Sequence, residues 1–113
     1  MKYGNKKVQI DGIAFDSKRE AARYSDLKLL QKAGLIACLE LQKEFELIPA
    51  QYRNVNGKKI CVERSVKYKA DFCYFDNEKR RWIVEDTKGF KTKDYIIKRK
   101  LLLFVHGIEI VEV

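Results

Sequence analysis

The chain has 113 residues, a length typical of one domain, and its 46% hydrophobic and 35% charged residues exclude a disordered or low-complexity protein. The formal net charge of +8 favours a polyanionic partner, with nucleic acid as the first expectation and a membrane surface as the rival. A soluble protein with solvated lysines is the plainest alternative. We expect a single domain over residues 1–113.

The cysteines and the apolar runs bear on the compartment. Cys38, Cys61 and Cys73 are widely spaced and form no CxxC pair, which favours neither a disulfide framework nor a zinc site. They are typical of reduced thiols and predict a cytoplasmic protein. No apolar run approaches the roughly 18 residues of a membrane span, and no apolar stretch follows the basic N-terminus as in a secretory signal. We therefore expect no membrane partner.

The first third of the chain predicts a short extended entry and a helix. Residues 7–15 alternate weakly in polarity, which indicates a short strand or hairpin. Ser17 as N-cap and Glu20 three residues later form a capping box. Apolar residues at helical spacing follow this cap, and Gly34 is a typical stop signal, so we expect a helix over residues 17–33.

The middle of the chain predicts a strand and a basic hairpin. The apolar residues 35–39 are expected to link the helix to a strand at 44–48, where polar and apolar residues alternate. An Asn-Gly dipeptide then separates residues 50–55 from 58–63. This dipeptide is the strongest short hairpin signal, so the two segments are expected to pair.

The last part of the chain predicts two paired strands, a helix and a final strand. Residues 66–75 and 81–88 alternate in polarity around a polar turn and are expected to form a hairpin. Thr92 is a plausible N-cap for a helix that Gly107 ends. Residues 108–113 alternate again, which predicts a final strand.

Two apolar features indicate where the core should lie. Ile97, Leu101 and Phe104 recur at helical spacing in the second helix and predict its buried side. Trp82 is also expected in the core.

The candidate chemistry lies on the two strands of the predicted hairpin. Asp71 is on one strand, and Asp86 and Lys88 are two residues apart on the next, so all three can share one face. Carboxylate oxygens suit Mg²⁺, which polarises a phosphate and activates water, while a lysine can orient that water or stabilise developing charge. Glu85 should point to the opposite face of the strand, or support the site residues without contacting the metal directly. The three residues predict metal-assisted phosphodiester hydrolysis.

The residues around this constellation resemble a known superfamily. Residues 68–72 and 83–89 are similar to the signature of the PD-(D/E)XK nucleases, with Ala70 in place of the signature proline. Nearly the whole chain also resembles a small phage-associated, uncharacterised family within that superfamily. The segments that carry this closer resemblance are 15–20, 41–42, 70–72 and 85–89.

The resemblance implies a fold, an activity and further site residues. The fold would be α/β with a restriction-endonuclease-like core: a helix, three antiparallel strands, a helix and a strand, in a central mixed sheet flanked by helices. The activity would be DNA cleavage with Mg²⁺, for which Mn²⁺ can substitute. Glu20 would join Asp71 and Asp86 as a metal ligand, although the capping box explains Glu20 without any metal. Gln42 would hold the phosphate or the water.

Basic residues form two groups that could contact phosphates. The first group follows the catalytic strand and, with Lys69 and Gln42, is expected to bind DNA; it comprises Lys91, Lys93, Lys98 and Arg99. A second group lies on the predicted hairpin and comprises Arg53, Lys58, Lys59, Arg64, Lys67 and Lys69. Tyr52 and Tyr68 interleave with this second group and could stack on bases. Lysines on a helix face are also commonly just solvated.

The sequence therefore predicts a metal-dependent DNA endonuclease with no small-molecule substrate. We expect a role in phage DNA recombination or processing within the host cytoplasm, with branched DNA or Holliday junctions favoured over duplex. Symmetric cutting of two strands implies a homodimer. The alternative is a catalytically inactive, basic DNA-binding protein on a nuclease fold.

Overall fold

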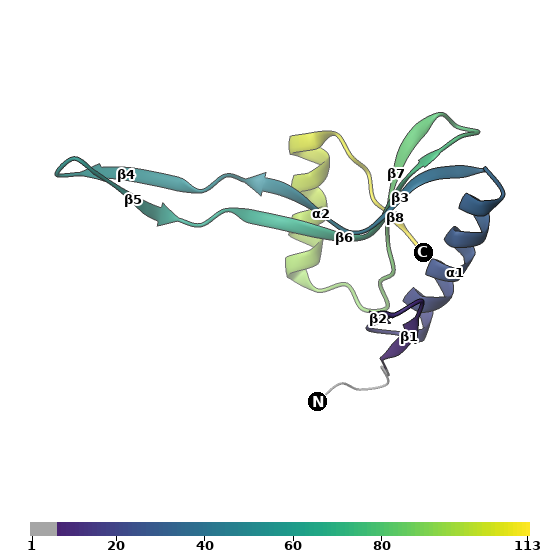
Figure 1. The fold of residues 1–113 in the computed structure, drawn as a ribbon. Coiled ribbons are helices and arrows are strands. Elements are labelled where there is room, and N and C mark those ends of the chain that lie inside the picture. The colour runs from purple at the N-terminus through teal and green to yellow at the C-terminus, as the bar shows by residue number, and fades with distance from the viewer. Residues whose placement is uncertain (1–6) are drawn as a thin grey trace.

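The computed structural model describes residues 7–113, which form two helices and three separate sheets (Figure 1). The helices are α1 (Lys18–Lys32) and α2 (Lys93–His106). The strands are β1 (Val8–Ile10), β2 (Ile13–Phe15), β3 (Ile36–Ile48), β4 (Gln51–Val55), β5 (Lys58–Glu63), β6 (Val66–Asp76), β7 (Arg81–Asp86) and β8 (Val111–Glu112). The prediction of an α/β protein with a mixed sheet and two helices is confirmed.

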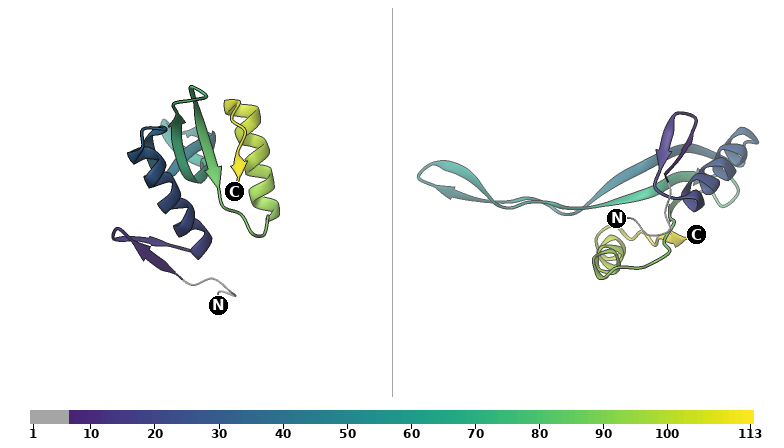
Figure 2. Two further views of the ribbon diagram at one scale, coloured as in Figure 1. Left: turned by 90° about the vertical axis from the view of Figure 1, so that its right-hand side faces the viewer. Right: turned by 90° about the horizontal axis from the view of Figure 1, so that it is seen from below.

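The main sheet has the strand order β3-β6-β7-β8. The pairs β3–β6 and β6–β7 are antiparallel, and β8 is parallel to β7 because α2 carries the chain back across the sheet. One hydrophobic cluster joins α1 to Phe72 and Ile83, and a second joins α2 to the adjacent residues Cys73 and Val84. Consecutive residues of a strand point to opposite faces, so the two helices cover opposite faces of the sheet (Figure 2).

The first helix forms as its sequence predicts. The hydroxyl of Ser17 accepts the backbone N–H of Glu20, which satisfies one donor of the first turn. Ala21, Tyr24 and Leu27 are buried on one side. Before this helix, β1 and β2 pair as the short hairpin that the weak alternation indicates.

The strand β3 begins earlier than predicted. Residues 35–39 were expected as a link, whereas β3 starts at Ile36 and runs for 13 residues. Cys38 and Gln42 both have positive φ angles, and the pairing with β6 shifts register near Cys38. Such irregularities interrupt the alternation of polar and apolar residues along the strand, so the sequence pattern alone does not predict the strand here.

Later elements differ from expectation in their ends and in their buried sides. The strand predicted over 81–88 ends at Asp86, and the one predicted over 108–113 is reduced to Val111–Glu112. Trp82 was expected in the core but is 59% exposed. It packs edge-on against Phe75 at the surface.

The second helix buries a different side from the predicted one. Tyr95 and Leu102 face the sheet, whereas Ile97 and Phe104 are 57% and 87% exposed. The helix has apolar residues on two sides, so periodicity alone could not select the side that meets the sheet. Within residues 7–113, neither helix is long and apolar enough to cross a membrane.

Candidate functional site

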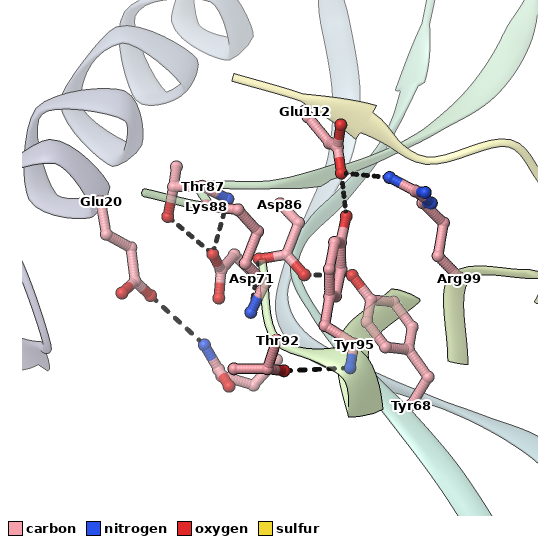
Figure 3. A network of polar contacts seen from close by, with 11 residues as sticks. Glu20, Tyr68, Asp71, Asp86, Thr87, Lys88, Thr92, Tyr95, Arg99 and Glu112 are labelled. Atoms are coloured by element: carbon pink, nitrogen blue, oxygen red, sulfur yellow. Dashed lines mark hydrogen bonds and ion pairs between the residues drawn. The ribbon is translucent and has the colours of Figure 1, made fainter. Parts of the chain in front are cut away.

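Asp71 and Asp86 lie next to each other at one end of the β6–β7 pair. The register places Phe72 opposite Glu85, so Asp71 and Asp86 occupy the next position along the two strands. Both follow the alternation that points towards α2, since Cys73 and Val84 pack there. The predicted juxtaposition of these two acids is therefore what the structure shows (Figure 3).

Asp86 is a fully buried carboxylate whose charge is poorly compensated. It is 0% exposed, and the Tyr68 hydroxyl donates a hydrogen bond to its Oδ2. Its Oδ1 accepts no hydrogen bond, and the Lys88 ammonium lies 3.7 Å from that atom. Burial, and then the neighbouring Asp71, raise the pKa of Asp86 to about 7. The fold thus holds a carboxylate in a place that disfavours its charged form.

Asp71 is held in one orientation by the residue that follows Asp86. The backbone N–H of Thr87 and its hydroxyl both donate to Oδ2 of Asp71, at 2.9 and 2.7 Å. Thr87 lies just beyond the end of β7, where its backbone N–H turns towards β6. Two donors on one oxygen fix the carboxylate plane beside Asp86.

Lys88 is positioned by an aromatic ring as well as by Asp86. Its ammonium lies 4.8 Å from the centre of the Tyr95 ring, which attracts a cation through the ring face. The Tyr95 hydroxyl in turn donates to Oε2 of Glu112 at 2.6 Å. The side chain of Lys88 is 32% exposed, so it lies at the boundary between the buried acids and solvent.

Glu20 reaches the same cluster from the first helix. Figure 3 shows Asp71 between Glu20 and Asp86. Burial raises the pKa of Glu20 to about 7, with further contributions from the charges of Asp71 and Asp16. Gln42 donates to Oε2 of Glu20 at 3.4 Å from its irregular position in β3. The Ser17 cap uses the backbone N–H of Glu20, while the carboxylate of Glu20 interacts with the backbone of Asp16, which lowers its pKa, and with Gln42.

The carboxylates of Asp71, Asp86 and Glu20 are oxygen ligands of the kind that a small divalent cation binds. Among the residues that the structure describes, no group of three or more His, Cys, Asp or Glu side chains is arranged to hold a metal ion. Mg²⁺ is nevertheless commonly bound by one or two carboxylates, with water and phosphate oxygens completing its shell. Asp71 and Asp86 supply two adjacent carboxylates, and Oδ1 of Asp86 is a buried acceptor without a hydrogen bond. These two residues therefore fit a magnesium ion, with Glu20 as a more distant third acid.

Of the predicted DNA-binding residues, the structure brings Lys91 and Arg99 together on one carboxylate, that of Glu112. Lys91 and Arg99 form ion pairs with Glu112 at 3.2 and 3.1 Å, so an anion would have to compete with that carboxylate. Lys69 lies opposite Glu44 in the register of β3 and β6, which offsets its charge. Lys93 is exposed and Lys98 half-buried on α2, and Gln42 contacts Glu20 as described above.

Four residues around the acids were not assigned to the site from sequence. Tyr68 holds Asp86, Thr87 holds Asp71, Tyr95 lies under Lys88, and Glu112 anchors Tyr95. Thr87 alone has a local signal, because it stands between Asp86 and Lys88 and carries a hydroxyl.

The fold and site together define an α/β protein with a cluster of buried and half-buried carboxylates beside a lysine. The chain belongs to the family described as "Protein of unknown function (DUF1064)", whose model matches residues 1–107. No curated protein and no solved structure matches it. The description of the family names no activity. The chemistry of the chain is centred on four residues, which we call the acidic–lysine cluster: Glu20, Asp71, Asp86 and Lys88.

Proposed function

We propose that this protein is a metal-dependent endonuclease that hydrolyses phosphodiester bonds in DNA. The observation that carries the proposal is Asp86. A fully buried carboxylate with one oxygen lacking a hydrogen bond, next to a second carboxylate and a lysine, is costly for a purely structural residue. A divalent cation would compensate this arrangement, because it favours the charged forms of both acids.

Each residue of the cluster has a role in the proposed reaction. Mg²⁺, or Mn²⁺ in its place, would be held by Asp71 and Asp86 and would supply Lewis-acid activation of the scissile phosphate and of water. Thr87 keeps the carboxylate of Asp71 in one plane. Lys88, at the boundary of the buried cluster, faces the side from which a phosphate would approach and stabilises negative charge there. Glu20 adds a third acid from the helix side.

The substrate proposal is branched DNA, such as a Holliday junction, or duplex DNA during phage recombination or processing in a host cytoplasm. The order of α1, the antiparallel strands β3, β6 and β7, then α2 and a parallel β8 supports a restriction-endonuclease-like core. The described part of the chain carries one acidic–lysine cluster. Symmetric cutting of two DNA strands needs two such clusters and would therefore require a homodimer.

The proposal is tested by a cleavage panel of four-way junction, flap, fork, duplex and single strand. We expect at least one of these substrates to be cut with Mg²⁺ or Mn²⁺ and none with EDTA. An Asp71→Asn protein is the matched control, and it should bind DNA without cutting it. If wild type binds DNA but cuts no substrate with either metal, the protein is instead a non-catalytic DNA-binding protein, an alternative in line with the absence of a three-residue metal group among residues 7–113.

Replacing Thr87 with valine should slow cleavage by about 10-fold or more, because groups that orient a metal ligand typically contribute that much. Valine has nearly the same shape but removes the hydroxyl that donates to Asp71 at 2.7 Å. The measurement is the single-turnover rate on the preferred substrate at saturating Mg²⁺. Thr87→Ser keeps a hydroxyl and should retain most of the rate. Equal rates for Thr87→Val and wild type would show that this hydrogen bond does not support the reaction.

A further inference from the structure

A long β-ribbon extends away from the body of the protein. Figures 1 and 2 show β4 and β5 projecting beyond both helices and the main sheet. The two strands pair only with each other, and every residue from 51 to 64 is exposed. We call residues 51–64 the arm.

The shape of the arm indicates that it acts on something outside its own chain. The radius of gyration is 17.2 Å and the longest extent is 57 Å. A compact domain of this length would have a radius of gyration of about 13 Å. An isolated two-stranded hairpin is marginally stable in water. Since the body does not support the arm, a bound partner is the natural source of further stabilisation.

The charge of the arm selects the class of partner. The arm carries four basic side chains and a single acidic one, Glu63; the basic residues are Arg53, Lys58, Lys59 and Arg64. At the base of the ribbon the charges are balanced, because Glu44 and Glu46 lie opposite Lys69 and Lys67 in the register of β3 and β6. The arm therefore carries a net positive charge that its own base does not cancel, and this charge is complementary to a polyanion.

The geometry of the arm fits the groove of duplex DNA. A two-stranded ribbon is one of the elements that the major groove admits. One face of the ribbon alternates basic and aliphatic residues, with Arg53 paired to Ile60 and Val55 paired to Lys58. Basic groups can reach the phosphates at the groove edges while the aliphatic side chains contact base methyl groups and sugars.

We propose that the arm binds duplex DNA at a distance from the bond that is cut. This proposal rests on the proposed nuclease function. Asp71 lies twelve positions after Lys59 along the ribbon. At about 3.3 Å per residue this corresponds to a reach of about 40 Å. That is on the order of one helical turn of DNA. The preferred substrate would then have a duplex segment of at least one turn beside the scissile phosphate.

The test compares two variants with the same change in net charge. The first replaces Arg53, Lys58 and Lys59 with glutamine. The second, the control, replaces the exposed residues Lys28 and Lys32 of α1 and Lys79 of the β6–β7 turn with glutamine. Binding to a 40-base-pair duplex is measured by fluorescence anisotropy in EDTA over a series of NaCl concentrations, after circular dichroism has confirmed the fold.

The arm variant should lose on the order of 10-fold or more in affinity, and its log–log salt dependence should flatten by about 2 to 3, since each phosphate contact contributes about 0.9 to that slope. The control should match wild type. Equal slopes for the two variants would overturn the proposal. So would a shift from dimer to monomer in sedimentation with an unchanged salt slope, because the arm would then bind a second copy. Binding is measured in EDTA and does not depend on cleavage, so the arm can be tested even if the protein proves not to be a nuclease. If the protein cleaves DNA but the arm variant binds like the control, only the proposal for the arm is contradicted.

Discussion

Replacing Asp86 with asparagine is expected to stabilise the folded protein by about 1–3 kcal/mol in the absence of metal, because it removes a buried and poorly compensated charge. The same change should lower the cleavage rate by about 10³-fold or more, since it removes a carboxylate of the proposed metal site. Asparagine has the same shape, and its oxygen can still accept the hydrogen bond from Tyr68. Urea unfolding gives the free energy of unfolding, and single-turnover assays give the rate.

The pH dependence of this gain follows from the raised pKa. The carboxyl of Asp86 has a pKa of about 7 in the folded protein against an ordinary 3.8, so the folded state favours the neutral form. The cost to the wild-type protein is therefore absent below about pH 4, grows as the pH rises, and is complete above about pH 7. The difference in unfolding free energy between Asp86→Asn and wild type should increase over that range and then stay constant.

Added Mg²⁺ should separate the two proteins further. Ligands that bind the folded state alone stabilise it, so the wild-type midpoint of unfolding should rise with Mg²⁺ while that of Asp86→Asn stays nearly unchanged. Asp26→Asn is the matched control, because Asp26 is exposed on α1 and its replacement should change stability by less than about 0.5 kcal/mol. An Asp86→Asn protein that is less stable than wild type, or that cuts DNA at the wild-type rate, would contradict the prediction.

The centre of the site could be predicted because its geometry is local. Asp71 and Asp86 lie on two strands joined by a short turn, and strand alternation with hairpin register places them together. The same alternation separates Glu85 from Lys88. The supporting residues depend instead on long-range packing: Tyr95 reaches the cluster through the docking of α2, and Glu112 through the parallel strand β8. Sequence spacing contains no information about either contact.

The longest strand and the second helix show two further limits of pattern reading. Positive φ angles at Cys38 and Gln42 interrupt the alternation of β3, so its first half resembles an apolar link. In β6, strict alternation would put Tyr68 and Phe72 on one face, yet Tyr68 packs with α2 and Phe72 with α1. The twist of a long strand pair turns its faces along its length, and a period of two does not describe that rotation.

Glu85 and Asp86 are consecutive acids in β7 that the fold treats in opposite ways. Arg23 of α1 donates two hydrogen bonds to the carboxylate of Glu85, at 2.8 and 2.6 Å, and the Tyr74 hydroxyl donates another. The hydrogen bond to Glu85 raises the pKa of Arg23, so the guanidinium stays charged. Glu85 is thereby compensated within the protein, whereas, among the described residues, Asp86 on the other face has only the Lys88 ammonium at 3.7 Å from Oδ1 and no hydrogen bond to that atom.

This contrast predicts that Arg23→Met destabilises the protein by about 3 kcal/mol or more, because it leaves Glu85 as a buried charge without its partner. Urea unfolding followed by circular dichroism measures the loss. Arg19→Met is the matched control on the exposed side of the same helix and should change stability by less than about 0.5 kcal/mol. Adding Glu85→Gln to Arg23→Met removes the buried charge and should restore much of the lost stability. Equal costs for the Arg23 and Arg19 variants would show that the Arg23–Glu85 pair does not fix β7 against α1. The orientation of Asp86 would then depend on the strand register and on the hydrogen bond from Tyr68.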